Sequence, residues 1–191
     1  MSQDQTKLAR VPLLSIEEAR AAAEKVGVQS QLAELNIFRG LLHQPQLAKV
    51  VSDLLLTLIF RGKLEDRLRE LVIMRLGWAT DSVYEWTQHW RIARQMEIPE
   101  EDLVALRDWR SSDRFNDADR AVLAATDETL ETGTVSRETW AACEAHVGDV
   151  PELLELVAAI GTWRLISSLL RSLEIPLEDG TPAWPPDGQR P

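Results

Sequence analysis

The segment from Glu65 to Ala79, EDRLRELVIMRLGWA, constrains the fold more than any other part of the chain. In helical projection its apolar residues lie on nearly every side, which is typical of a helix that is buried all round. The rest of the sequence has no strand-like alternation of useful length and no detectable repeat, so other helices must enclose this one. The sequence therefore predicts an all-α bundle with a buried central helix.

Capping residues and prolines predict where the other helices begin and end. A Ser15/Glu18 capping box and Gly27 bound the first helix. Further helices are expected at about 30–43, 45–62, 82–97, 99–109, 117–132, 137–147 and 151–173, with a loop at 110–115. We expect a single domain over residues 1–175, followed by an irregular, proline-rich tail over 176–191.

Composition limits the partners and the compartment. The 191 residues carry 21 basic and 31 acidic side chains, and a net charge of -10 opposes binding to nucleic acid or to an anionic membrane. The N-terminus lacks a signal pattern, and apolar runs such as 54–60 are too short to span a bilayer, so we expect a cytoplasmic protein. A single cysteine, Cys143, excludes an intramolecular disulfide and any cysteine-cluster metal site within one chain.

Two chemically active side chains lie where apolar ones are expected. In the helix over 83–97, Glu85 and His89 fall within the apolar half of the circumference and are four residues apart, so the carboxylate can reach the imidazole. Glu70 is a similar exception on the preceding helix. If the two helices form an antiparallel hairpin across Thr80 and Asp81, the three side chains converge in one pocket suited to general acid-base chemistry.

Other interpretations of these residues stay open at this level. An i to i+4 Glu/His pair also occurs as a purely structural link between surfaces. Glu70, Glu85 and His89 are also plausible zinc or manganese ligands, with His43 as a possible addition, but no second histidine lies at ligand spacing, and we predict neither a metal nor a cofactor.

Several residues are candidates for contacting a substrate. Arg39 and His43 lie four apart on one helix and form a candidate polar wall for an anionic ligand. Trp86 and Trp163, together with Trp78 and Trp90, either line an aromatic pocket or fill the core.

The string RLRELVIMRLGWATDSVYEWTQHWRIARQMEIPEEDLVAL resembles the core of the carboxymuconolactone decarboxylase and alkylhydroperoxidase D superfamily, and YEWTQH is its most specific part. The resemblance extends over about residues 36–178. It implies an alkylhydroperoxidase D-like helical bundle, in which the motif helix adjoins the central helix, and assembly into homo-oligomers, trimers or hexamers.

In the peroxidase branch of this superfamily, a glutamate precedes a Cys-x-x-Cys-x-x-x-His motif. Here the motif reads Ser82-x-x-Glu85-x-x-x-His89, and Glu70 matches the upstream glutamate. Ser82 and Glu85 therefore replace both sulfurs, and a dithiol cycle is excluded. We assign Ser82 to the substrate-binding set with Trp86, Trp163, Arg39 and His43.

The decarboxylase branch works without a cofactor, and the resemblance implies that His89 shuttles a proton, Glu85 orients and tunes it, and Glu70 holds a second proton. Thr162-Trp163-Arg164 departs from the polar segment expected in relatives. The predicted function is a cofactor-independent acid-base enzyme acting on a small carboxylate, lactone or enolisable carbonyl metabolite by decarboxylation, isomerisation or cyclisation. The alternatives are a non-catalytic helical oligomer or ligand-binding protein, and a metal-dependent enzyme using the same three residues.

Overall fold

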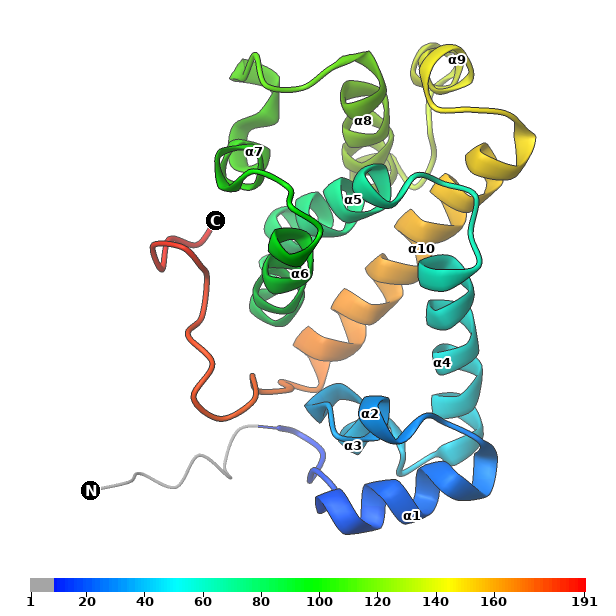
Figure 1. Ribbon diagram of the computed structural model, residues 1–191, viewed down its shortest axis with the longest axis vertical. Coiled ribbons are helices and arrows are strands. Elements are labelled where there is room, and N and C mark those ends of the chain that lie inside the picture. The colour runs from blue at the N-terminus through cyan, green and yellow to red at the C-terminus, as the bar shows by residue number, and fades with distance from the viewer. Residues whose placement is uncertain (1–8) are drawn as a thin grey trace. The chain divides into compact units, whose positions relative to one another are not determined.

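The computed structural model describes residues 9–191, which contain helices and no strand, as Figure 1 shows. The prediction of an all-α, alkylhydroperoxidase D-like bundle is confirmed. The elements are α1 Ile16–Val26, α2 Ser30–Ala33, α3 Asn36–Leu41, α4 Pro45–Phe60, α5 Asp66–Ala79, α6 Val83–Gln95, α7 Glu100–Ala105, the 3-10 helix η2 Leu106–Ser111, α8 Asp117–Thr132, α9 Arg137–His146 and α10 Val150–Ser172.

The chain forms two compact units. Unit 1 comprises the residues up to Thr57 together with Ser168–Thr181, and unit 2 comprises Leu58–Ser167 together with Pro182–Pro191. The residues expected to form one tail, 176–191, are thus divided between the units. The expectation of a single domain followed by a tail stays a prediction.

In unit 1, the predicted caps of α1 are present. Ser15 and Glu18 form a reciprocal capping box, and Gly27 ends the helix in the left-handed conformation at φ 72°. The helix expected over 30–43 is instead broken into α2 and α3, because Leu35 has an extended backbone with ψ 138°. The break frees the backbone N–H of Asn36, which donates to Glu178 Oε1 at 3.1 Å.

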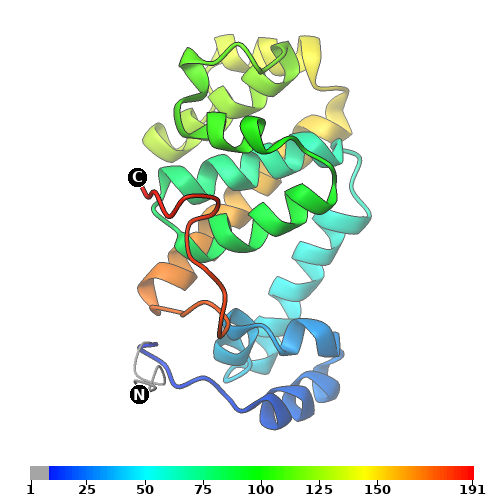
Figure 2. The same ribbon diagram turned by 60° about the vertical axis from the view of Figure 1, so that its left-hand side comes forward.

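In unit 2, α5 and α6 lie side by side and antiparallel (Figure 1, Figure 2). α5 is the buried central helix that the sequence predicts, with side chains such as Leu71, Ile73 and Leu76 fully enclosed. Its other large contact is with α8. Gly77 allows the close approach to α6, since a Cβ at this position would lie 3.0 Å from the backbone nitrogen of Trp86.

The last ten residues also belong to unit 2 and are fixed to it at several points. Trp184 is buried, and its backbone N–H donates to Thr87 Oγ1 at 3.2 Å. The Trp86 indole donates to the Pro185 carbonyl at 2.8 Å, and Arg107 forms two hydrogen bonds to the Asp187 carboxylate. This segment has no helix, and it is well anchored because its one tryptophan fills part of the core.

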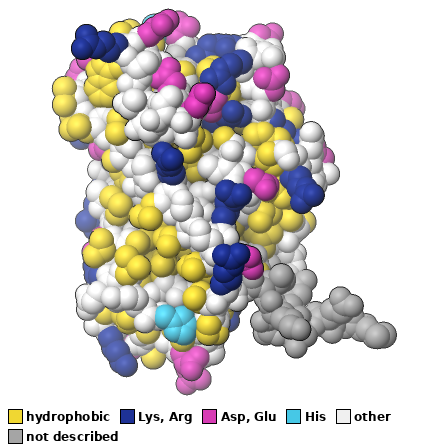
Figure 3. Space-filling view, turned by 180° about the vertical axis from the view of Figure 1, so that it is seen from behind, with side chains coloured by type: hydrophobic (Ala, Val, Ile, Leu, Met, Phe, Trp, Pro, Cys, Tyr) yellow, Lys and Arg dark blue, Asp and Glu magenta, His cyan; other side chains and the backbone are white. Residues whose placement is uncertain are grey.

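α10 is apolar on more than its buried side. Val150, Leu154, Val157 and Leu165 form an exposed stripe along the helix, and Figure 3 shows one face of the molecule on which hydrophobic side chains gather among scattered basic ones. By length and composition α10 would suffice to cross a bilayer, but half of that apolar window is buried within the protein. The absence of a membrane partner stays a prediction.

Candidate acid-base site

His89 and Glu70 form the centre of the site. His89 Nδ1 lies 2.8 Å from Glu70 Oε2, and only 1% of the Glu70 side chain is exposed. The two residues come from adjacent helices, α6 and α5, so the hairpin joins them as the sequence led us to expect. A buried carboxylate at this distance fixes the orientation of the imidazole ring.

Trp163 on α10 fixes the position of the ring proton. Its indole nitrogen lies 3.3 Å from His89 Nε2, and the two rings meet edge to face with centroids 5.9 Å apart. An indole N–H can only donate, so Nε2 must be the acceptor. The single ring hydrogen is then on Nδ1 and is donated to Glu70. The lone pair on Nε2 is the one that accepts the indole N–H.

Glu85 does not have the partner that its spacing suggests. The sequence places it against His89, but the structure gives that position to Glu70, because Glu70 approaches the ring from α5. The Glu85 side chain is 2% exposed, and neither of its oxygens is hydrogen-bonded within the described part of the chain. Burial raises the pKa of this carboxyl to about 7, and the nearby Ser82, His89 and Ser167 only partly oppose the effect.

Three hydroxyl groups lie close to this carboxyl or to one another. Thr80 Oγ1 donates to the Leu76 carbonyl at 2.8 Å and lies 2.7 Å from Ser167 Oγ. Because Thr80 has only one hydroxyl hydrogen, Ser167 must be the donor in the second bond. The Ser82 hydroxyl is buried near Glu85 and has no hydrogen bond of good geometry within residues 9–191. Thr80 and Ser167 were not identified from the sequence, because hydroxyl side chains on helices carry no distinctive spacing.

The arginines of α5 are committed to protein carboxylates. Arg69 bonds Asp66 at 2.7 Å, and its Nε lies 3.9 Å from Glu70 Oε1, so it offsets part of the Glu70 charge. Arg75 is paired with Asp127 at 2.6 Å. These contacts show that both arginines balance carboxylates of the protein.

Trp86 and Trp163 are both almost fully enclosed. The sequence allowed them either to line an aromatic pocket or to fill the core. The Trp86 ring lies 5.1 Å from that of Trp78 and 6.3 Å from that of Trp184, centroid to centroid. Arg107 stacks over Trp78 at 4.8 Å. Trp86 is therefore part of an aromatic cluster in the core of unit 2, whereas Trp163 contacts the site through His89.

Arg39 and His43 lie in unit 1 on or just after α3, and both bond local carbonyl groups. Arg39 donates to the Leu14 carbonyl at 2.7 Å and to Asn36 Oδ1 at 2.7 Å. His43 Nε2 lies 2.7 Å from the Pro12 carbonyl. Their role in binding an anionic substrate stays a prediction.

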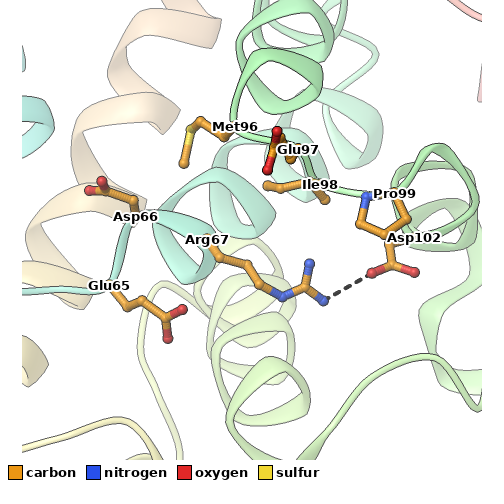
Figure 4. Close-up of a pocket in the computed structure, with 8 residues that line it drawn as sticks. All are labelled: Glu65, Asp66, Arg67, Met96, Glu97, Ile98, Pro99 and Asp102. Carbon is orange, nitrogen blue, oxygen red and sulfur yellow. Dashed lines mark hydrogen bonds and ion pairs between the residues drawn. The ribbon is translucent and has the colours of Figure 1, made fainter.

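Unit 2 also contains a separate cavity of about 640 Å³ at the start of α5 and the end of α6 (Figure 4). Its lining consists of Glu65, Asp66, Arg67, Met96, Glu97, Ile98, Pro99 and Asp102. Arg67 and Asp102 are paired across it at 3.2 Å. None of the candidate residues lines this cavity. Over residues 9–191, no group of three His, Cys, Asp or Glu side chains is arranged to hold a metal ion.

Comparison with known families confirms the resemblance seen in the sequence. Residues 45–128 match the sequence model of the carboxymuconolactone decarboxylase family. This range runs from α4 into α8 and includes Glu70, Ser82, Glu85 and His89. No curated protein matches the chain.

Several solved structures share the fold. A putative antioxidant defence protein AhpD from Agrobacterium tumefaciens is 22% identical, with 72% of this chain and 96% of that chain covered and a TM-score of 0.65. An AhpD-core, peroxidase-related protein from Ralstonia eutropha is 17% identical, with 90% and 93% covered and a TM-score of 0.73. A cysteine-to-alanine variant of the debrominase Bmp8, in complex with 2,3,4-tribromopyrrole, is 16% identical, with 93% and 95% covered and a TM-score of 0.69. At these identities the similarity shows the fold alone.

Proposed function

We propose that this chain, whose residues 45–128 carry the pattern of the carboxymuconolactone decarboxylase family, is a cofactor-independent acid-base enzyme. Its substrate is a small carboxylate, lactone or enolisable carbonyl compound, and the reaction is a decarboxylation, isomerisation or cyclisation. The observation that carries this proposal is the His89 ring, held between Glu70 and Trp163 with its proton on Nδ1 and a lone pair on Nε2.

This arrangement suits a general base. When Nε2 takes a proton from a substrate, the imidazolium that forms is stabilised by the Glu70 carboxylate 2.8 Å away. Glu70 thus has the orienting role that the resemblance led us to expect for Glu85. A substrate that reaches Nε2 takes the place of the Trp163 N–H, which makes Trp163 part of the surface that the substrate contacts.

Thiol peroxidase chemistry does not fit this chain, although peroxidase-related proteins share its fold. Its one cysteine, Cys143, is buried on α9, with its sulfur 3.7 Å from the Ala121 carbonyl. Burial raises the pKa of the Cys143 thiol to about 11, so it forms little thiolate at neutral pH. A peroxidatic dithiol cycle needs a reactive thiolate and a second thiol.

The proposal is tested by replacing the dyad. His89→Ala and Glu70→Gln, purified as folded proteins, should lose about 10²- to 10⁴-fold in the rate of proton transfer on a carbonyl substrate, measured by deuterium incorporation. His146→Ala, at an exposed position on α9, serves as the matched control and should retain the rate. Full turnover by His89→Ala would show that His89 is not the proton carrier.

The exposed stripe on α10 supports a second proposal, that copies of the chain associate into a homo-oligomer. An apolar row over several helical turns is typical of a surface covered by a partner. Leu154→Lys should lower the mass measured by light scattering, whereas a wild-type protein that is monomeric at micromolar concentration would contradict the proposal. The alternative function is a non-catalytic oligomer. Such a protein would form the oligomer but would show no proton transfer on any carbonyl substrate.

A further inference from the structure

We infer that Glu85 is a neutral carboxylic acid that donates a proton to the substrate, and that the substrate is an enolisable carbonyl compound with an uncharged reacting end. The inference rests on the proposed function, since it assigns the acid that works opposite the His89 base. It separates the roles of two carboxyl groups that the sequence cannot distinguish.

The surroundings of Glu85 favour the protonated form. The side chain is 2% exposed, and neither oxygen makes a hydrogen bond of good geometry within the part of the chain that the structure describes, although the Ser82 and Ser167 hydroxyls lie nearby. The single hydroxyl hydrogen of Ser167 is given to Thr80, so Ser167 presents only lone pairs to Glu85. A buried carboxylate without well-formed hydrogen bonds is costly, whereas a carboxylic acid can donate to an acceptor such as the Ser167 hydroxyl.

The charged groups around Glu85 support the same conclusion. From α5, Glu70 brings a negative charge that Arg69 offsets only in part. The raised pKa of Glu85 agrees with these contacts. The two carboxyl groups therefore differ in their partners: Glu70 lies beside an imidazole nitrogen and an arginine, whereas Glu85 has neither and keeps its proton.

Glu85 and His89 form a donor and acceptor pair on one side of α6. They are four residues apart, so their Cβ atoms are separated by about 5–6 Å, which suits the two ends of an H–C–C=O unit. His89 Nε2 takes the α-hydrogen, and the C–H electron pair becomes the C=C bond. The carbonyl π pair takes the Glu85 proton and gives an enol. The products at the protein are an imidazolium and a carboxylate, which return their protons in the reverse step, so no co-reactant is needed.

The charges around Glu70 favour a substrate whose reacting end is uncharged. The α5 arginines Arg67, Arg69 and Arg75 are each paired with aspartates of the protein. A substrate carboxylate bound next to Glu70 would be repelled, and none of these three arginines is available to offset it. Enolisation of a neutral ketone is therefore favoured over decarboxylation of a keto acid.

The first experiment uses two isosteric probes, pyruvamide and pyruvate, whose methyl hydrogens exchange with deuterium through an enol. Each enzymatic rate, measured by proton NMR, is divided by the rate with free imidazole. We expect the corrected rate to be at least about tenfold higher for pyruvamide than for pyruvate, because the amide lacks the charge that Glu70 repels. A preference for pyruvate, or loss of its carboxylate, would overturn the inference and leave the proposed function standing. No exchange on either probe would count against the proposed function itself.

The second experiment tests Glu85 directly and needs no substrate. The difference infrared spectrum between wild type and Glu85→Gln at pH 6 should contain the carbonyl band of a protonated carboxyl group, and Glu138→Gln, at an exposed position on α9, should lack this difference. In the exchange assay Glu85→Gln, which keeps an N–H donor but cannot transfer a proton, should lose about 10²-fold. A carboxylate band in place of the acid band would overturn the assignment.

Discussion

The packing of α5 against α6 depends on Gly77, and Gly77→Ala tests how tightly the site is held. The added Cβ would lie 3.0 Å from the Trp86 nitrogen, 3.3 Å from Glu85 Cβ and 3.5 Å from Trp86 Cα. Two of these three atoms are backbone atoms of α6 and cannot rotate away. Relief requires the helices to separate, and overpacking of this kind costs about 1–3 kcal/mol.

The higher helix propensity of alanine offsets part of the cost of overpacking. Alanine within a helix is more favourable than glycine by about 0.5–1 kcal/mol. Taking the middle of each range, the expected net change is a loss of about 1 kcal/mol in the free energy of unfolding. Because the helices must separate, the Glu70–His89 contact lengthens, and the rate of proton transfer should fall by more than the fraction of protein that is unfolded.

Gly161→Ala provides the matched control. Gly161 is also in a helix, α10, but a Cβ there would meet no atom of its own chain within 4 Å, so in the dissociated monomer only the gain in helix propensity remains. Urea unfolding followed by circular dichroism should show Gly77→Ala less stable than wild type and Gly161→Ala more stable by about 0.5–1 kcal/mol. Equal stabilisation by both substitutions would refute the argument that α5 and α6 are in close contact at Gly77.

Three further predictions concern single side chains. Since the pKa of Glu85 is raised to about 7 in the folded protein and is near 4.5 in the unfolded chain, its contribution to stability is complete below pH 4.5 and is lost as the pH rises through 7. As the pH rises from 4.5 to 7, the free energy of unfolding of wild type should therefore decrease relative to that of Glu85→Gln. Urea titrations that show no such trend would contradict a buried neutral acid at this position. Trp163→Phe removes the donor to His89 Nε2, so the ¹⁵N resonance of that nitrogen should shift in NMR spectra while the Nδ1–H bond to Glu70 persists; an unchanged Nε2 shift would show that the indole contact is absent in solution. Cys143 should resist iodoacetamide in the native protein and react after denaturation, and rapid native labelling would be inconsistent with its burial.

The features that the sequence by itself determined are local ones. The capping box at Ser15 and the left-handed glycine after α1 depend on contacts within a few residues, so the sequence identified them. The enclosure of α5 followed from its composition, because a helix without a polar face has to be buried. The positions of Glu85 and His89 on the apolar side of α6 followed from helical periodicity in the same way.

Tertiary structure alone decided which groups these side chains meet. Sequence spacing paired Glu85 with His89, but Glu70 from α5 occupies Nδ1, and Trp163, from a helix more than 70 residues away in the chain, occupies Nε2. The break before Asn36 and the anchoring of Trp184 likewise depend on partners distant in sequence. Helical periodicity determines the direction in which a side chain points, whereas the element that packs there, and therefore the protonation state of a buried carboxyl, depends on the three-dimensional arrangement of the helices.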